Sequence, residues 1–421
     1  MILYGSHNKN IELFPKTQIN NHGNDEHGGL IWEWDPVRHR KVAKQMAPAF
    51  SGRALQAKAL TLHKYVDLFV DRMTSLGSAT RGVDLTTWIN WLCVDMSADM
   101  AYNREMNALK NMEEPRYLTL LQDFNKAIVI IQMFWRFPLL VPLKYLFLLF
   151  KMVRSHSDIR DHSRQLLERR IRRKDSVEHI DFFEQLIPKN REPPKDPKEM
   201  RHLEQVAGQL LVAGYEPPAM WLYFTMYHLL KSPEHLKTLI NEIRGTFKSY
   251  DDITPESAAE LSFLAACLKE SLRLTPGLLT GLPVGSPGAH VDGHFIPRGL
   301  IVNSPQVVCQ SSSFSMARDS RNFSDALQFR PERWLSEDHP LYVSQFSNDN
   351  QKAFQPFSQG PRMCSGREIA WWQSRLFVAK VLWKFDLAMV SGEHPDIDRD
   401  LKGWGITYAA KRIVHMQDHA G

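Results

Sequence analysis

The stretch at positions 357–366, F-S-Q-G-P-R-M-C-S-G, constrains this chain most, because it places one cysteine among glycines just before a helical pattern. That pattern runs from Arg367 to about Phe385. The pKa of a thiol falls near cationic groups and helix N-termini, and Cys364 has Arg362 two residues before it. A thiolate is a soft ligand, so the stretch is suited to hold iron. The alternative, favoured for any lone cysteine, is a buried side chain in a Gly/Pro loop.

Five spaced positions of this stretch favour the iron site. Phe357, Gly360, Arg362, Cys364 and Gly366 fit F-x-x-G-x-R-x-C-x-G, and the stretch closely resembles the cysteine loop of the cytochrome P-450 (haem-thiolate) family. The resemblance implies the family's mainly α-helical fold with small β-sheets. It also implies haem b, an iron protoporphyrin, with Cys364 as the axial ligand of the iron. The glycines would let the backbone approach the macrocycle, Phe357 would shield the sulfur from water, and Arg362 would pair with a propionate.

The composition is compatible with a large enzyme domain and argues against other classes. The chain has 421 residues, 43% of them hydrophobic, and a net charge of +5, too mild to indicate nucleic acid as the main partner. Four widely separated cysteines without a C-x-x-C pair predict neither a zinc site nor a disulfide framework, and favour a reducing compartment. Residues 1–31 are polar and carry no signal peptide or long apolar run, so no membrane anchor is expected there. We expect residues 32–421 to form a single haem-thiolate domain.

A basic helix is expected over residues 37–50, with Asp35 as its N-cap. Without the cysteine loop, its cationic cluster would indicate only a solvated helix face. With that loop, it resembles the family's propionate-binding helix, H-R-x-x-R, in which His39 and Arg40 match and Ala43 replaces the second arginine. The same alignment implies a chain shortened at its N-terminus, without the family's membrane-anchor helix.

A long helix is expected from about Lys198 to Leu230, and it contains the segment L-V-A-G-Y-E-P-P-A. This segment resembles the family's central helix, whose A-G-x-E/D-T-T sequence crosses the haem face. The resemblance places Ala213 and Gly214 beside the haem. It places Pro217 at the threonine whose hydroxyl relays protons to dioxygen.

Proline changes what this segment can do. It has no N–H, so the carbonyls of Ala213 and Gly214 should lose their helical partners and the helix should kink. Glu216 is a candidate proton-handling carboxylate, although a cap for the second half-helix fits it equally well. The alternative is a loop between two shorter helices.

Two further motifs predict a structural charge network. Glu270 and Arg273 lie three apart in a helical pattern over residues 261–276, and alone they would indicate a weak surface ion pair. The sequence F-R-P-E-R-W at 329–334 resembles the family's partner motif, so Arg333 is expected to join them in a buried network that supports the cysteine loop.

The segment between these motifs departs from the family pattern. T-G-L-P at 280–283 resembles the fungal T-G-L-P-R turn, whose arginine commonly meets a propionate, but Val284 stands at that position. Residues 293–299 predict a strand-turn-strand unit, and the serine-rich run at 309–315 predicts a surface loop.

The most apolar segment, residues 127–153, is interrupted by Arg136, Pro138, Pro142 and Lys144 and therefore does not predict a membrane span. By position it resembles the family's access-channel region, so a lipophilic substrate and a peripheral membrane contact are expected. The arginine-rich run at 168–174 predicts an exposed helix face rather than a nucleic-acid site.

Three functions remain open at this point. The first is a monooxygenase of fungal secondary metabolism that hydroxylates or desaturates a lipophilic metabolite with electrons from an NADPH-cytochrome P-450 reductase. The second is a haem-thiolate enzyme for rearrangement, dehydration or peroxide chemistry, which can dispense with the threonine relay. The third is a degenerate binding protein without catalysis. The resemblance places the chain on the endoplasmic reticulum surface, and the missing anchor leaves the cytoplasm as the alternative.

Overall fold

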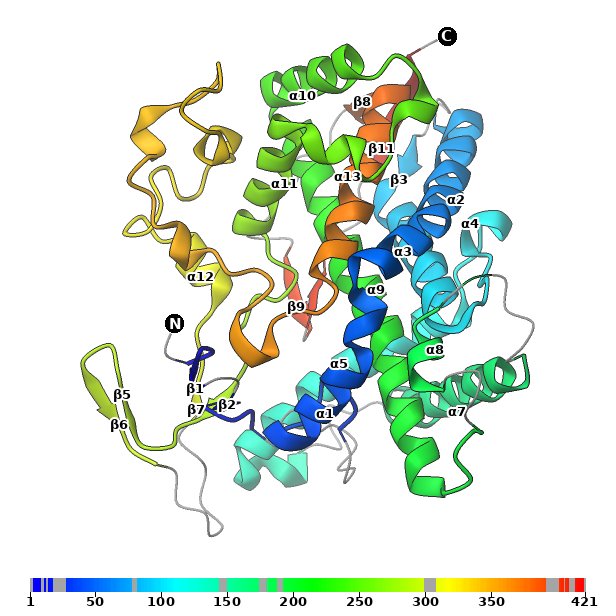
Figure 1. Cartoon of the computed structure of the whole chain (residues 1–421), viewed down its shortest axis with the longest axis vertical. Helices are drawn as coiled ribbons and strands as arrows, with labels where there is room; N and C mark the ends of the chain where they lie inside the picture. Colours follow the sequence, from blue (N-terminus) through cyan, green and yellow to red (C-terminus); the bar gives the residue numbers. More distant parts are fainter. Residues whose placement is uncertain are drawn as a thin grey trace.

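The computed structural model describes residues 3–8, 11–12, 14–17, 28–77, 82–143, 150–173, 179, 181–187, 192–298, 308–390, 401–404, 406–408 and 413–419. Over these residues the chain is mainly helical with several small antiparallel sheets, which confirms the expected fold class (Figure 1). The longest helix, α9, spans Pro197–Leu230 and passes through the middle of the molecule.

Helix α9 forms where the sequence predicts it. Asp196 caps its N-terminus by accepting the N–H of Glu199 at 3.3 Å, and Pro197 occupies the first turn. The helix continues through Pro217 and Pro218, so the alternative of two shorter helices joined by a loop is wrong. Burial of nearly every side chain in the C-terminal half stabilises the helix against the cost of these prolines.

Helix α3, Leu85–Tyr102, packs closely along α9. The Ser97 hydroxyl of α3 donates a hydrogen bond to the Leu211 carbonyl at 2.7 Å. A Cβ atom added to Gly214 would lie 2.5 Å from the Ser97 Oγ. Glycine is therefore required at 214 for helix packing, whatever else lies beside it.

The remaining long helices complete one hydrophobic core. Those that pack with α9 or with each other are α2 (Gly52–Leu76), α10 (Pro233–Thr246), α11 (Ser262–Leu274), α13 (Arg367–Lys384), α5 (Arg116–Arg136) and α7 (Phe150–Arg172). The short helices are α4 (Ala108–Asn111), α8 (Phe183–Leu186) and α12 (Ser313–Ala317). Single 3-10 turns lie at η3 (Pro138–Leu143), η4 (Tyr250–Asp252), η5 (Ser257–Glu260), η6 (Pro331–Trp334), η7 (Ser344–Phe346), η8 (Gln351–Ala353) and η9 (Gly360–Arg362).

The basic helix is confirmed as α1, Pro36–Met46, which continues into the 3-10 turn η2, Ala47–Phe50. Asp35 accepts the N–H groups of Val37 at 2.9 Å and Arg38 at 2.8 Å, so it is the N-cap that the sequence predicts.

The sheets are small and antiparallel. Strand β11 (Ile413–Asp418) lies between β3 (Val83–Asp84) and β8 (Phe385–Met389). Two-stranded pairs are β1 (Ser6–Asn8) with β2 (Ile11–Glu12), β4 (Val284–Gly285) with β7 (Val308–Cys309), β5 (Ala289–Val291) with β6 (His294–Ile296), and β9 (Lys402–Trp404) with β10 (Ile406–Tyr408).

Two local predictions are corrected by the structure. The hairpin predicted at 293–299 turns earlier, at Asp292 and Gly293, whose φ angles of 51° and 81° suit a tight two-residue turn. The serine-rich run is not only loop, because Ser312 accepts the N–H of Ser315 at 3.1 Å and caps the short helix α12.

The arginine-rich run also differs from expectation at one position. Arg170 is buried, and its Nε lies 2.5 Å from an Asp181 carboxylate oxygen, with 3% and 0% of the two side chains exposed. The prediction of a wholly exposed face is therefore wrong at Arg170, because a partner eleven residues later provides the compensating charge.

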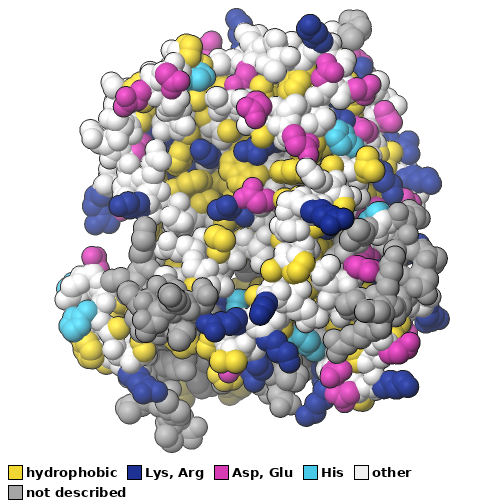
Figure 2. All heavy atoms as spheres, in the orientation of Figure 1, with side chains coloured by type: hydrophobic (Ala, Val, Ile, Leu, Met, Phe, Trp, Pro, Cys, Tyr) yellow, Lys and Arg dark blue, Asp and Glu magenta, His cyan; other side chains and the backbone are white. Residues whose placement is uncertain are grey.

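The surface carries interspersed charges. On the face seen in Figure 2, acidic and basic side chains alternate over most of the visible protein, in keeping with the mild net charge. Among the described residues, no helix is both long and apolar enough to span a bilayer.

Candidate active site

Backbone hydrogen bonds shape the cysteine loop. The 3-10 turn η9 brings the Met363 N–H to the Gly360 carbonyl at 3.1 Å, and the Cys364 N–H donates to the Phe357 carbonyl at 2.9 Å. Gly360 has a φ of +70°, and a Cβ atom there would collide with the Tyr4 carbonyl, so glycine is required. Gly366 precedes the first turn of α13. The loop thus presents Cys364 at a helix N-terminus.

The environment of the Cys364 thiol is less cationic than the sequence suggests. The residue has accessible surface, yet surrounding protein desolvates the thiol and raises its pKa above the ordinary value. The Gly366 N–H and the charge of Arg367 lower the pKa by less than burial raises it. The expected net lowering is therefore wrong for the protein alone, and Arg362 is not among the causes. A coordinated iron would supply the positive charge that ionises such a thiol.

Aromatic contacts hold this loop against the central helices. The ring of Phe357 packs edge-on against Trp221 of α9, with 5.8 Å between centroids. Trp221 also packs against Trp371 of α13 at 4.9 Å and donates its indole N–H to the Leu268 carbonyl of α11 at 3.0 Å. Trp221 therefore connects α9, α11, α13 and the cysteine loop.

Cations gather beside the loop, where the resemblance predicts propionate contacts. Arg362 donates to the Glu33 carbonyl at 2.7 Å and to the Trp34 carbonyl at 3.5 Å. His39 is buried nearby, and burial together with the charges of Arg362 and Lys16 lowers its pKa to about 4. Arg40, the next residue along α1, is exposed, and its predicted contact with a propionate stays a prediction. Lys16 is the member of this group that the sequence analysis missed.

The carboxylate of Glu33 is bound mainly by Arg38, although its charge also raises the pKa of His39. Arg38 donates to both Glu33 oxygens at 3.1 Å, and the Asp35 N–H donates to one of them at 2.9 Å. The pKa of Glu33 lies below its ordinary value: burial raises it, but the Arg38 hydrogen bond and the backbone donors together lower it more. Arg362 and Lys16 place two positive charges near the His39 imidazole, an arrangement that suits an anionic ligand.

Helix α9 presents small residues and a proline on one side and a carboxylate on another. Ala213 is exposed, and Gly214 and Pro217 are half-buried. A Cβ atom on Gly277, in the loop after α11, would lie 3.3 Å from the Pro217 Cβ, so the Pro217 ring faces that loop. Glu216 is buried and accepts a hydrogen bond from the Asn125 Nδ2 of α5 at 2.7 Å. Glu216 and Pro217 therefore face different elements.

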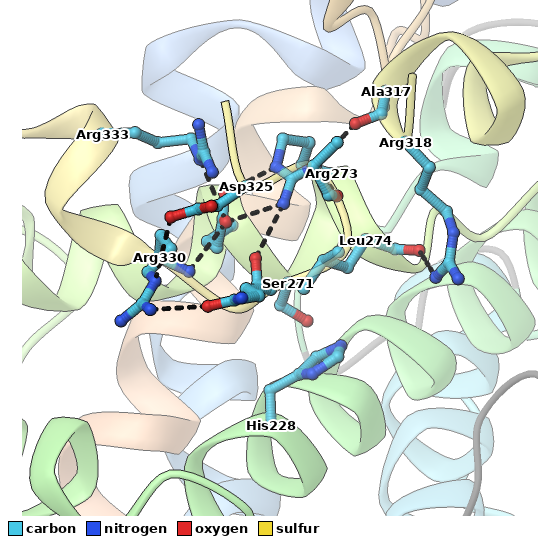
Figure 3. A network of polar contacts seen from close by, with 12 residues as sticks. His228, Ser271, Arg273, Leu274, Ala317, Arg318, Asp325, Arg330 and Arg333 are labelled. Carbon is cyan, nitrogen blue, oxygen red and sulfur yellow. Dashed lines mark hydrogen bonds and ion pairs between the residues drawn. The ribbon is translucent and has the colours of Figure 1, made fainter. Parts of the chain in front are cut away.

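The predicted charge network is assembled and buried. Glu270 accepts hydrogen bonds from Arg273 at 2.8 and 2.9 Å and from Arg333 at 3.1 Å, and the side chains of Glu270, Arg273 and Arg333 are at most 1% exposed. The Arg330 N–H and the Trp334 indole, each at 2.9 Å, complete the donors to this carboxylate. Figure 3 shows this network around Arg273 and Arg333, whereas the Arg330 guanidinium lies beside Asp325, with 3.8 Å between its Nε and a carboxylate oxygen.

The Arg273 guanidinium extends the network into the following segment. It donates to the carbonyls of Ala317 at 2.5 Å, Ala326 at 2.7 Å and Gln328 at 3.0 Å, whereas Arg333 pairs with Asp349 and donates to the Ser324 carbonyl at 2.8 Å. One carboxylate and two guanidinium groups thus fix some thirty residues of irregular chain ahead of the cysteine loop.

The donor set fits a haem better than a bare metal ion. No group of three or more His, Cys, Asp or Glu side chains in the described parts of the chain is arranged to hold a metal. A haem needs only one protein sulfur for its iron and cations for its propionates, which Cys364 and the group beside Arg362 provide. The residues present therefore fit a haem, whereas the structure packs Gly214 against Ser97 of α3 and leaves Ala213 exposed.

Comparison with known proteins gives the same family. The model of the family described as "Cytochrome P-450" matches residues 4–415. Over 404 residues, the chain is 71% identical to cytochrome P-450 monooxygenase TwmD of Talaromyces wortmannii, covering 96% of this chain and 78% of that protein. It is 31% identical to cytochrome P-450 monooxygenase BOA3 of Botryotinia fuckeliana, covering 92% and 75% of the two chains. It is 30% identical to cytochrome P-450 monooxygenase btcC of Colletotrichum orbiculare, covering 100% and 79%.

Proposed function

The chain belongs to the cytochrome P-450 family of oxygen-incorporating haem-thiolate oxidoreductases, and on that premise we propose that it hydroxylates or desaturates a lipophilic secondary metabolite. Electrons would come from an NADPH-cytochrome P-450 reductase. The observation that carries the proposal is the cysteine loop, in which the Cys364 thiol is presented at the start of α13 with its backbone fixed by Phe357. The monooxygenases similar to this chain come from fungi, which supports a fungal metabolite as the substrate.

Some residues of the site would bind the haem, and others would help to deliver protons. Cys364 would hold the haem iron, and Arg362 and His39 would hold the propionates; bound haem supplies the iron that activates dioxygen. Packing of Phe357 on Trp221 excludes water from one side of the loop. Pro217 has no hydroxyl to donate, and the Ala213 and Gly214 carbonyls lack the N–H donors of Pro217 and Pro218. Water held at these carbonyls would deliver protons in place of a threonine.

An apolar surface supports the lipophilic substrate and a peripheral membrane contact. At the end of α5 and in η3, large apolar side chains are exposed: Met133 (39%), Phe137 (57%), Leu139 (94%), Leu140 (39%), Val141 (37%) and Leu143 (44%). A contiguous exposed apolar segment of this kind suits a lipid surface. The proposal therefore includes location at the endoplasmic reticulum surface, where substrate and reductase would meet the chain.

Expression in a fungal host with a known metabolite pool tests the reaction. Metabolite analysis with and without the gene identifies substrate and product, and the purified protein is then supplied with that substrate, reductase and NADPH. The proposal predicts a product that contains one additional oxygen or lacks two hydrogens, and requires both NADPH and reductase. A product isomeric with the substrate, or one formed without NADPH, would contradict it.

Pro217 favours one second candidate function. A haem-thiolate enzyme that rearranges or dehydrates its substrate, or that uses peroxide, does not need a hydroxyl to relay protons to dioxygen. Pro217 carries no hydroxyl at this position, and its half-buried ring faces Gly277. Turnover with substrate alone, or with peroxide in place of NADPH and reductase, is the result that this candidate predicts.

A further inference from the structure

We propose that Lys16 is a propionate-binding residue that replaces the positive charge absent at Val284. The inference rests on the proposed haem site, and it concerns a residue that no family motif in this sequence indicates. Lys16 lies in the polar N-terminal segment, outside the predicted haem-thiolate domain. The structure nevertheless brings it to the cations beside the cysteine loop.

The backbone places Lys16 next to Val284. The two residues form an antiparallel bridge. On either side of it, the Gly285 N–H donates to the Pro15 carbonyl at 2.8 Å and the Thr17 N–H donates to the Pro283 carbonyl at 3.3 Å. The N-terminal segment thus adds a short strand along β4. An arginine at 284 and the lysine at 16 would project from neighbouring strands at the same level of the sheet.

The side chain of Lys16 is buried beside the segment that Arg362 also contacts, with its Nζ 5.6 Å from the centroid of the Trp32 ring. It is only 5% exposed. Lys16, Val284 and Arg362 line one small cavity, together with Phe14 and Leu282. The charges of both Lys16 and Arg362 reach His39. The shared cavity therefore places Lys16 with Arg362, in keeping with the pairing of Lys16 with Val284 and the effect of both charges on His39.

Lys16 and Arg362 also donate to the same segment of backbone. Lys16 Nζ donates to the Ile31 carbonyl, and Arg362 donates to the carbonyls of Glu33 and Trp34. Gln209 of α9 fixes the start of this segment, accepting the N–H groups of Leu30 at 2.8 Å and Ile31 at 2.6 Å. The two cations are therefore held side by side by a backbone that α9 anchors.

The charges balance with Lys16 included. Two propionates carry two negative charges, and Arg362 and Lys16 supply two positive charges. Burial and the charges of Arg362 and Lys16 lower the pKa of His39 to about 4 before any ligand is bound, so we assign His39 a hydrogen bond to a propionate and no charge of its own. Ala43 and Val284, which stand where the motifs that this sequence resembles have arginine, supply no charge, so we assign the second propionate to Lys16.

The test measures how firmly the purified holoprotein holds haem, by following transfer of haem to excess apomyoglobin. Lys16→Met keeps the length of the side chain and removes its charge, and Lys16→Arg keeps the charge. Lys44→Met, on the exposed side of α1, is the matched control. We expect Lys16→Met to release haem about tenfold faster or more, because the variant loses one charged hydrogen bond. Lys16→Arg and Lys44→Met should release it at the parental rate.

A second readout separates a charge effect from a packing effect. Val284→Arg added to Lys16→Met should restore slow release, because it returns a cation to the neighbouring strand. Lys16→Met should also shift the iron reduction potential to a more negative value, which a purely structural role of Lys16 would not do. Release from Lys16→Met at the same rate as from Lys44→Met overturns the inference. The proposed function fails separately, if the parental protein binds no haem.

Discussion

The charge network around Glu270 allows a quantitative prediction, because one carboxylate serves two buried guanidinium groups. Glu270→Ala removes the acceptor of five hydrogen bonds, three of them from Arg273 and Arg333. Breaking a buried ion pair by deleting one partner costs about 3–5 kcal/mol, since the remaining charge stays desolvated. Arg333 keeps Asp349 as a partner, whereas Arg273 retains only backbone carbonyls. We expect a loss of about 3–5 kcal/mol in the free energy of unfolding.

Urea unfolding of the haem-loaded protein, followed by tryptophan fluorescence, measures this loss as a lower midpoint. Glu270→Gln retains the shape of the side chain and should show most of the loss, which separates the missing charge from the cavity that alanine leaves. Arg321→Ala is the control, because Arg321 pairs with Asp319 on the surface of the same region with 87% of its side chain exposed. A midpoint for Glu270→Ala equal to that of Arg321→Ala would refute a stabilising role for the network.

Three other predictions concern Asp95, Pro217 and Leu139. Burial raises the pKa of Asp95 to about 6 against 3.8 when exposed, so its contribution to stability is present below about pH 4 and is lost as pH rises through 6. The free energy of unfolding of Asp95→Asn, relative to that of the parent, should therefore rise by roughly 3 kcal/mol between pH 4 and pH 8 when measured by urea unfolding. A relative free energy that stays constant over this range would contradict the prediction. Pro217→Thr should stabilise α9 by about 1–3 kcal/mol, because it restores an N–H donor to the Ala213 carbonyl. It should also raise the fraction of consumed NADPH that yields product. An unchanged melting temperature and an unchanged fraction would show that the proline is neutral. Leu139→Glu should weaken binding to phospholipid vesicles about tenfold in sedimentation, whereas Leu60→Glu, on an exposed part of α2, should not, and equal effects would contradict the membrane contact.

The elements that the sequence predicts well are those specified by neighbouring residues. The Asp35 cap, the start of α9 at Pro197 and the helix after Cys364 depend on side chains within one turn of the boundary. The Glu270 network was also predictable, because its members lie in motifs that the family resemblance identifies. In each case the pattern requires no knowledge of distant parts of the chain.

The features that the sequence does not reveal depend on contacts between distant segments. Lys16 reaches the site only because residues 15–17 pair with residues 283–285, and Asn125 of α5 bonds Glu216 of α9 although the two lie 91 positions apart. Desolvation by surrounding protein has the largest effect on the pKa of Cys364, and the sequence around Cys364 does not indicate it.

The central claim is that the Cys364 sulfur ligates haem iron. The reduced carbon-monoxide spectrum of the purified protein tests it most directly, recorded for the parent and for Cys364→Ala, with Cys309→Ala as the control in a second partly accessible cysteine. We predict a strongly red-shifted Soret band for the parent and for Cys309→Ala, and its loss in Cys364→Ala. A colourless protein in the presence of hemin, or the same band in Cys364→Ala, would contradict the claim.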